Sequence, residues 1–559
     1  MSRPPGTKLT PQIARDLCQR TGSKAYLTGS ISNLGSQYVI GVDAVNCQTG
    51  DDLAREQVTA DGKEQVLKAL SDASTRLRAR LGESLKTVQQ LDAPIDQATT
   101  PSLEALQAYS LGRKTVLLRG DYTGALPLFE RAISLDPNFA MAYASLGTAY
   151  HNLGEKNLAA QNTKKAYDLR AHVSEWERFY IESHYHQFVT GDLEEASQAY
   201  ELWAMAYPRD QVARNNLGIV YQNLGEHEKA LAKFKEAAEV APPDALTYGN
   251  LALTYIHLNR FDEAAATAQQ GISKNLDSPD LHLYLYQLAF IQGDSAGMAR
   301  QLEWAAGKPG AGSTMLCFAA DSAAYSGKLG KARELTTQAV AAALQAGEKE
   351  KAASCAAAAA TWEAFLGNSA KAQQYASSAL ALSNGRDAEY PAALALAVAG
   401  DVARAANLTS DLAKRFPSDT VVQFNYLPTI QARLALGHGE NAKAVELLQP
   451  ASPYEMGVPG VSNFANNLYS IYVRGEALLA TRQGGEAAAQ FEKLIRSRGV
   501  AINDPIGALA HLGLARAQLL SEDPAGAKSS YQSFFNLWKD ADGGIPVLKS
   551  AQAEYAKLH

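Results

Sequence analysis

Long apolar segments are missing from this chain of 559 residues. It contains no run of about 18 uninterrupted apolar residues, and the alanine-rich stretch Cys355–Ala360 is too short and too weakly apolar to cross a bilayer. The first residues, MSRPPGTKLT, also lack the charged and then apolar regions of a signal peptide. We therefore expect no membrane span in this chain and a cytoplasmic location for the chain as written.

An excess of one charge is missing as well. The 52 Lys and Arg residues nearly balance the 58 Asp and Glu residues, which gives a formal net charge of −6. A broad basic field, which nucleic-acid binding requires, is therefore absent from the composition. We expect no nucleic-acid partner.

Cysteine is scarce, with four residues in the whole chain. None shows the close C-x-x-C pairing of a zinc or redox site. We expect Cys317 and Cys355 to be buried thiols. Cys18 and Cys47 flank a short α/β segment and could meet across it, either as separate thiols or as a disulfide. If they form a disulfide, the native compartment is oxidising.

Catalytic and metal-binding motifs are not found. The chain lacks the ordered phosphate loop, strand lysine, catalytic aspartate and magnesium aspartate of protein kinases. Gly307–Thr314 lacks the Gly-Lys-Ser/Thr ending of a phosphate loop and lies between expected helices. His184 and His186 are two residues apart and would point in different directions on a helix. We predict a non-enzymatic protein without cofactor or metal.

What the chain does contain is a regular spacing. Gly or Asn closes a helix-like segment at intervals of 34, 37, 34, 34 and 34 residues, at Gly120, Gly154, Gly191, Gly225, Asn259 and Gly293. A small or apolar residue follows each of them five positions later, at Ala125, Ala159, Ala196, Ala230, Ala264 and Met298. A fixed period of this length indicates stacked helix pairs. The 37-residue step predicts an insertion near Ser174–Trp176, in a longer second helix or a longer turn between repeats.

One unit carries a family resemblance. Residues Leu217–Pro242, LGIVYQNLGEHEKALAKFKEAAEVAP, resemble a tetratricopeptide repeat at its diagnostic positions. These positions are Leu217, Gly218 and Tyr221 on the first helix, Gly225 at the turn, Ala230, Phe234 and Ala237 on the second helix, and Pro242 after it. The resemblance implies that small residues let the two helices approach closely and that aromatic residues fill the space between neighbouring pairs.

The expected fold is mostly α: an α-α superhelical solenoid of such helix pairs, with a small α/β domain at the N-terminus. The α/β domain follows from a helix start at Thr10-Pro11 and three segments that alternate polar and apolar residues. The predicted domains are an α/β domain over 1–91, a linker over 92–101, well-formed repeats over 102–310, degenerate helix pairs over 311–543 and a capping helix over 544–559.

The N-terminal segment carries a second resemblance. Tyr26–Thr59 is similar to the small TolB-like domain that precedes tetratricopeptide repeats in many bacterial signalling proteins, through Gly29-Ser30 on a strand and the turn Asn46-x-x-Thr49-Gly50. That family has a further strand and helix before this segment, so the domain is expected to be incomplete.

The order of these parts resembles the sensor half of acidobacterial membrane-bound serine/threonine kinases. The stretches TPSLEALQAYSLG at Thr100–Gly112 and LWKDADGGIP at Leu537–Pro546 contribute to this resemblance. It implies an alternative function, as the detached regulatory part of a kinase whose catalytic domain is not in this chain. It also implies an alternative location outside the cytoplasmic membrane, where a Cys18–Cys47 disulfide would be stable.

The main prediction is a protein-interaction scaffold or sensor module that binds a peptide or protein in the concave groove. The first helix of each pair lines that groove in a stacked solenoid. Its candidate residues are Thr148, His151, Asn152, Asn215, Ile219, Gln222, Asn223, Leu253, Ile256, His257, Leu283, Gln287 and Phe290. This mixture of amide and apolar side chains favours an extended or helical peptide. Asn216 has no lysine partners, which argues against a clamp for a terminal carboxylate.

Overall fold

The fold is described from a computed structural model, over residues 9–20, 22–82, 99–241, 243–308, 310–458 and 466–558. Pro242 and residues 92–98 of the predicted linker lie outside these ranges. The chain divides into two compact units, residues 1–153 with 158–185, and residues 154–157 with 186–559. Within the described ranges, no helix combines the length and apolar character needed to cross a membrane.

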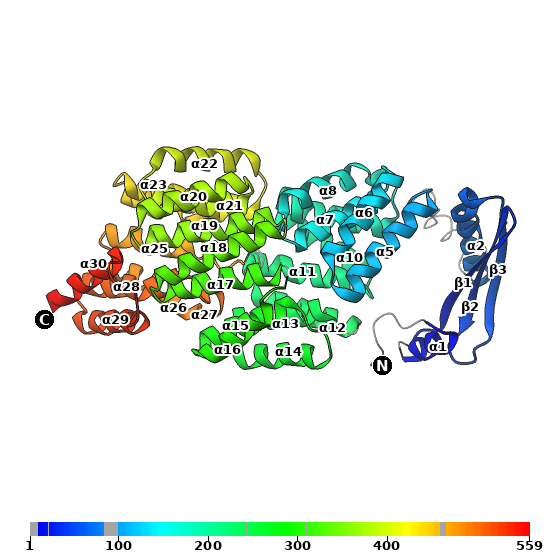
Figure 1. The fold of residues 1–559 in the computed structure, drawn as a ribbon, viewed down its shortest axis with the longest axis horizontal. Coiled ribbons are helices and arrows are strands. Elements are labelled where there is room, and N and C mark those ends of the chain that lie inside the picture. The colour runs from blue at the N-terminus through cyan, green and yellow to red at the C-terminus, as the bar shows by residue number, and fades with distance from the viewer. Residues whose placement is uncertain are drawn as a thin grey trace. The chain divides into compact units, whose positions relative to one another are not determined.

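The first unit begins with the predicted α/β domain (Figure 1). Helix α1 (Pro11–Arg20) precedes the strands β1 (Ala25–Leu34), β2 (Gln37–Asn46) and β3 (Asp52–Ala60), which form an antiparallel sheet in the order β1-β2-β3. A short 3-10 turn (Lys63–Gln65) leads into α2 (Val66–Arg80), which packs on β2 and β3. The apolar face of the helix meets alternate strand residues there, so one face of the sheet is covered.

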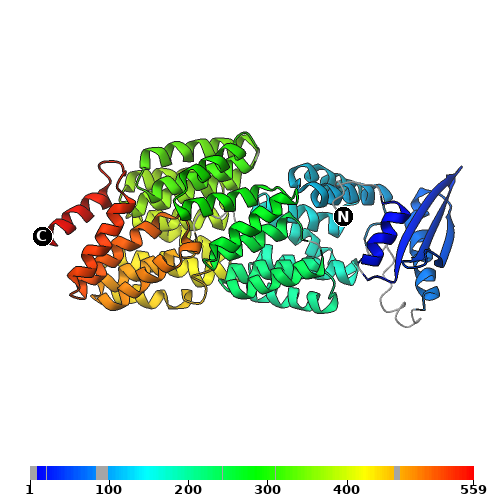
Figure 2. The same cartoon turned by 90° about the horizontal axis from the view of Figure 1, so that it is seen from below.

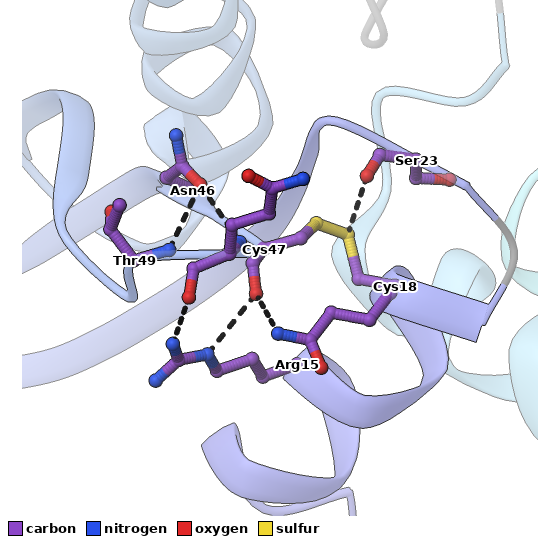
Figure 3. Close-up of a disulfide and its surroundings, with 8 residues drawn as sticks. Arg15, Cys18, Ser23, Asn46, Cys47 and Thr49 are labelled. Carbon is purple, nitrogen blue, oxygen red and sulfur yellow. Dashed lines mark hydrogen bonds between the residues drawn. A yellow bond between two sulfur atoms is a disulfide. The ribbon is translucent and has the colours of Figure 1, made fainter.

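A disulfide joins Cys18 on α1 to Cys47 just after β2 (Figure 3). The Cα atoms of the two cysteines are 5.7 Å apart. Arg15 and Gln19 of α1 donate hydrogen bonds to the carbonyl oxygen of Cys47, at 3.1 Å and 2.8 Å. The side chain of Asn46 accepts from the backbone N–H of Thr49 at 3.2 Å and so closes the turn. The N-terminal helix is therefore held to the sheet both covalently and through the turn that follows β2.

Helix pairs follow in the same unit. They comprise α5 (Leu103–Arg119), α6 (Tyr122–Leu135), α7 (Ala140–Asn152), α8 (Lys156–Asp168, from Leu158 onward in this unit) and α9 (Glu175–Tyr185). Gly120 ends α5 in the left-handed conformation with φ 63°, and Asp121 caps α6 by accepting from the N–H of Gly124 at 2.7 Å. A 3-10 turn at Arg170–His172 lengthens the connection between α8 and α9. This longer turn between repeats contributes to the 37-residue step, together with the π-helical turn at His186–Thr190 that follows α9.

The second unit continues the helix pairs (Figure 2). A π-helical turn, His186–Thr190, precedes α10. The helices are α10 (Leu193–Ala206), α11 (Gln211–Leu224), α12 (His227–Val240), α13 (Ala245–His257), α14 (Phe261–Ser273), α15 (Pro279–Gln292), α16 (Ser295–Ala305), α17 (Ala311–Tyr325), α18 (Leu329–Gln345), α19 (Lys349–Phe365), α20 (Ser369–Leu382), α21 (Arg386–Val398), α22 (Val402–Arg415), α23 (Leu427–Gly437), α24 (Asn441–Leu447), α25 (Tyr469–Ala480), α26 (Gly484–Arg496), α27 (Arg498–Ala501), α28 (Pro505–Leu520), α29 (Pro524–Leu537) and α30 (Pro546–Tyr555). Shorter turns lie at Val422–Tyr426, Gln449–Ala451 and Ala556–Leu558.

The repeat α11–α12 shows why its residues are small. A side-chain carbon at Gly218 would lie 2.6 Å from the ring of Phe234, so only glycine permits this approach of the two helices. Ala230 and Phe234 are fully buried between them. Gly225 ends α11 with φ 81° and Asn259 takes the same turn position after α13 with φ 58°. The local signals therefore produce the helix pairs as predicted.

Two later turns keep this geometry without glycine. Arg482 and Glu522 adopt positive φ values of 61° and 59° between α25 and α26 and between α28 and α29. Ala487 and Ala527, both fully buried, follow them five residues later. The five-residue step from a left-handed turn residue to a buried alanine thus continues into the last repeats. The turn residue there is neither Gly nor Asn, although residues with a longer side chain adopt this conformation only at a cost.

The second unit folds back on itself. The turns between the two helices of early repeats contact segments of repeats that come much later in the chain. The backbone N–H of Thr420 donates to the carbonyl of Gly191 at 3.0 Å, and that of Asp542 donates to the carbonyl of Gly327 at 3.0 Å. Helices α27 and α28 correspondingly contact α13 and α17 (Figure 1). Late repeats of this unit are therefore stacked on early ones.

The remaining two cysteines correct a prediction. Cys317 on α17 and Cys355 on α19 form a disulfide with a Cα–Cα distance of 5.8 Å, rather than lying as two buried thiols. The two helices are the first helices of consecutive pairs, and their closest faces are lined by alanine. Small side chains bring the backbones close enough for the sulfur atoms to meet.

Candidate functional site

The predicted groove residues fall into two groups. Asn215, Gln222, Leu253, Ile256, His257, Leu283 and Gln287 are buried, whereas Thr148, His151, Asn152, Ile219, Asn223 and Phe290 are at least partly exposed. All of the buried ones belong to the second unit. The open surface of the predicted groove is therefore much smaller in that unit than the sequence pattern predicts.

The buried amides connect neighbouring repeats. Asn250 Nδ2 donates to Asn215 Oδ1 at 2.9 Å, and Gln222 Nε2 donates to Thr254 Oγ1 at 2.7 Å. Each bond joins the first helix of one pair, α11, to the first helix of the next, α13. A buried amide without a hydrogen-bond partner lowers the stability of the fold. These side chains therefore connect neighbouring repeats and are not free to bind a ligand.

The returning chain covers the same region. The N–H of Val458 donates to the carbonyl of Gln222 at 3.2 Å. His227 Nε2 lies 3.0 Å from the carbonyl oxygen of Met456, so this nitrogen carries the hydrogen. Gly225 allows the contact, since a side-chain carbon there would lie 2.8 Å from the backbone of Met456.

A pair of buried histidines stands at this contact. The rings of His227 and His257 are 4.7 Å apart. Burial lowers the pKa of His227 to about 4, although the bond to Met456 acts in the opposite direction. Burial, and then the neighbouring His227, hold the pKa of His257 well below its ordinary value. Both rings are therefore neutral at neutral pH.

We expect acid to destabilise the second unit through these rings. The unfolded chain binds a proton at His227 near pH 6.5, whereas the folded chain does so only near pH 4. The contribution of the neutral ring to the free energy of unfolding is therefore fully present above pH 6.5 and is lost as the pH falls toward 4. At pH 5 the loss at His227 alone is roughly 2 kcal/mol. Urea unfolding of wild type and His227→Gln at neutral and acidic pH measures it. His438→Gln, at an exposed histidine, should keep the full acid sensitivity; an H227Q variant as acid-sensitive as wild type would contradict the assignment.

The first unit has a different polar surface, formed by the accessible Thr148 and Asn152 over the buried Tyr180 and His184. Thr148 Oγ1 and the Tyr180 hydroxyl are 2.7 Å apart, and Asn152 Nδ2 donates to the Thr148 carbonyl at 2.8 Å. Tyr180 stacks on His184, whose ring nitrogen lies 2.7 Å from the Tyr180 carbonyl. These residues come from α7 and α9, two successive first helices.

Arg113 on α5 completes this surface, and the sequence analysis overlooked it. Burial alone would lower the pKa of its guanidinium, but the hydroxyls of Tyr109 and Tyr180 reverse the effect and raise it. Burial lowers the pKa of His184 to about 4, with Arg113 contributing, so this ring stays neutral. Arg113 forms no ion pair with a described carboxylate. Arg113 is thus a half-buried cation among hydroxyl and amide groups. Its helix, α5, is the first helix of the pair that precedes those of α7 and α9.

Metal chemistry has no preformed site in the described part of the chain. No group of three or more His, Cys, Asp or Glu side chains lies close enough there to hold an ion. The positive and polar surface of α5, α7 and α9 is instead suited to an anionic group such as a carboxylate.

Comparisons with known proteins agree with this fold. Models described as tetratricopeptide repeat match residues 210–273 and 472–533, and one described as TPR repeat matches residues 117–154. The match at 472–533 includes the turn at Arg482, in the range predicted to be degenerate. No curated protein matches the chain.

Solved structures with similar segments include a TPR protein of Thermus thermophilus, at 25% identity over 32% of this chain and 96% of that one, with a TM-score of 0.25. Another is PilW, titled a type IV pilus biogenesis factor, at 18% identity over 36% and 92%, with a TM-score of 0.28. A third is YrrB, titled a TPR protein with an unusual peptide-binding site, at 21% identity over 35% and 94%, with a TM-score of 0.20. The chain contains tetratricopeptide repeats, and its fold is a TPR solenoid preceded by a small α/β domain.

Proposed function

We propose that this protein is a non-enzymatic interaction scaffold or sensor module, and that it binds a carboxylate-bearing peptide on the first-helix surface of the first unit. The observation that carries the proposal is Arg113, a half-buried guanidinium without an ion-pair partner among the described residues. Thr148 and Asn152 add hydrogen-bonding groups from the next first helix. An arginine can bind both oxygens of a carboxylate at once, which would fix the position of the peptide.

The second unit supports this choice of surface by contrast. Its amides at Asn215 and Gln222 already bond to the next repeat, and its returning chain contacts Gln222. An incoming peptide would have to break these contacts. At Arg113 the group that an incoming carboxylate would replace is the neutral Tyr180 hydroxyl rather than the backbone of a later repeat.

Peptide binding tests the proposal. An array of peptides with a free C-terminal carboxylate, and the same peptides as C-terminal amides, would be probed with wild type and Arg113→Met. We expect selected peptides to bind R113M at least about tenfold more weakly, because a hydrogen-bonded ion pair is lost. Arg131→Met, on the exposed side of α6, is the matched control and should bind as wild type does. Equal binding to wild type and R113M would reject this surface.

The compartment and the signalling role belong to the same proposal. We propose that the module works outside the cytoplasm, as the sensor part associated with a serine/threonine kinase. Two disulfides support this location, because cytoplasmic thiols are usually kept reduced. The three-stranded domain with its Asn46–Thr49 turn supports the TolB-like resemblance. Calorimetry with ATP should detect no binding to this chain, and ATP turnover would contradict a non-enzymatic role.

A further inference from the structure

The second unit contains a partly open cavity of about 60 Å³ where its early and late repeats meet. Its walls come from α13, α15 and α17 on one side and from the segments at Val458, Asn466 and 500–504 on the other. At about 10–15 Å³ for each water molecule, the space holds several waters or one small organic group. Its walls are partly apolar, with Tyr284 and Phe318 among them.

Two carboxyl groups line this cavity. Asp321 on α17 and Asp504 before α28 are 7% and 6% exposed, and neither forms an ion pair with a described Lys, Arg or His. Asp504 is held by the Tyr469 hydroxyl and by Asn466 Nδ2, both at 3.0 Å. The position of the Asp504 carboxyl is therefore fixed, and the negative charge that it can carry is not balanced by a neighbouring cation.

Two further acceptors in the cavity lack partners. Gln287 is 3% exposed, and its Oε1 atom accepts no hydrogen bond from the residues that the structure describes. His257 is 5% exposed, and its Nδ1 atom is likewise unpartnered. Both residues line the cavity with the two carboxyls. Buried acceptors are rarely left without a hydrogen bond, so a ligand in this cavity should carry hydrogen-bond donors.

We propose that this cavity binds a primary ammonium group, either of a small free amine or of a lysine side chain. An ammonium group supplies three N–H donors, which match the amide oxygen of Gln287, the imidazole nitrogen of His257 and the carboxyl of Asp321. Its positive charge also offsets the charge of Asp504, whose two oxygens already accept from Tyr469, Asn466 and the N–H of Ile506. The rings of Tyr284 and Phe318 suit the short carbon chain and can attract the cation. This site is separate from the peptide surface of the first unit.

The site should take up its ligand with release of a proton. Burial raises the pKa of Asp504 to about 7, and burial followed by the charge of Asp504 raises that of Asp321 well above its ordinary value. The other titratable groups that face this pair are Tyr469 on α25, Tyr390 on α21, Tyr284 and Tyr286 on α15 and His257 on α13. All five stay neutral, since burial raises the pKa of the tyrosines and lowers that of His257. As the ammonium binds, a carboxyl proton leaves to solvent.

Calorimetric titration of the full chain with methylammonium chloride tests the site, with potassium chloride at equal ionic strength as the reference. We expect saturable binding of one equivalent above pH 7, with affinity falling about tenfold per pH unit below it. Asp321→Asn and, independently, Gln287→Met should weaken binding at least about tenfold. Asp280→Asn, at a partly buried acid of α15 outside the cavity, should bind as wild type does.

The outcomes separate the alternatives. Binding of methylammonium but not of Nα-acetyl-lysine amide identifies a free amine as the ligand, and binding of both admits a lysine side chain. No saturable binding in correctly folded protein, or equal binding to wild type and D321N, overturns the proposal and leaves a cavity filled by water. Arg113→Met should keep methylammonium binding, so failure of the peptide surface and failure of this site can be told apart.

Discussion

Replacing Gly499 by alanine is expected to lower the free energy of unfolding of the second unit by roughly 4 kcal/mol. A side-chain carbon at this position would lie 1.7 Å from the carbonyl oxygen of Ile256, in a backbone contact between α27 and α13. The N–H of Gly499 also donates to Asn259 Oδ1 at 2.7 Å. Because backbone cannot move aside as a flexible side chain can, the clash must push α27 away from the early repeats.

Denaturant unfolding monitored by circular dichroism measures this effect. Gly485→Ala is the matched control, since Gly485 lies on the neighbouring helix α26 with no atom within 4 Å of the added carbon. G485A should be neutral or slightly stabilising, as alanine favours a helix over glycine. If G499A unfolded at the same denaturant concentration as G485A, the close contact between early and late repeats would be wrong.

Removal of the Cys317–Cys355 disulfide is expected to have an effect of similar size. The bond closes a segment with a sequence separation of 38 residues, for which the chain-entropy estimate gives roughly 4 kcal/mol. The double variant Cys317→Ala with Cys355→Ala should lower the unfolding midpoint of the second unit. Reductant should lower the wild-type midpoint similarly and should leave that of the double variant unchanged.

Peptide mapping without reductant provides the direct check. It should recover Cys317 linked to Cys355 and Cys18 linked to Cys47 in protein made in an oxidising compartment. Free thiols at all four positions would contradict both bonds and the proposed location together. A protein that kept the Cys18–Cys47 bond but lost the other would limit the contradiction to the second unit.

The helix pairs were predictable because their signals are local. A left-handed turn residue followed five positions later by a small residue fixes both the end of one helix and the close approach of the next, as at Gly225 and Ala230. The same local rule continues at Arg482 and Ala487, where the left-handed residue is not glycine. The prediction of degenerate pairs over 311–543 rested on the fading match to the diagnostic residues, and it stays a prediction.

The candidate site was predicted less well, for a related reason. The sequence analysis placed Asn215, Gln222 and His257 on first helices, and they are there. It assumed that the concave side stays open, which depends on whether late repeats return to cover it. The Cys317–Cys355 disulfide could have been predicted, because a sequence separation near the repeat length places both cysteines on the first helices of consecutive pairs.

The sequence by itself determined the period, the helix pairs, the three-stranded domain and the lack of kinase motifs, because these follow from periodicity and residue type over short distances. Only the tertiary structure decided which side chains remain available. Contacts such as Gly225 with Met456 and Asn259 with Gly499 join positions more than two hundred residues apart, and no local pattern encodes them. Together with the neighbouring repeats they bury most of the predicted groove residues of the second unit and form the cavity at Asp321 and Asp504. In the first unit, the half-buried Arg113 is a cation that the spacing had not indicated.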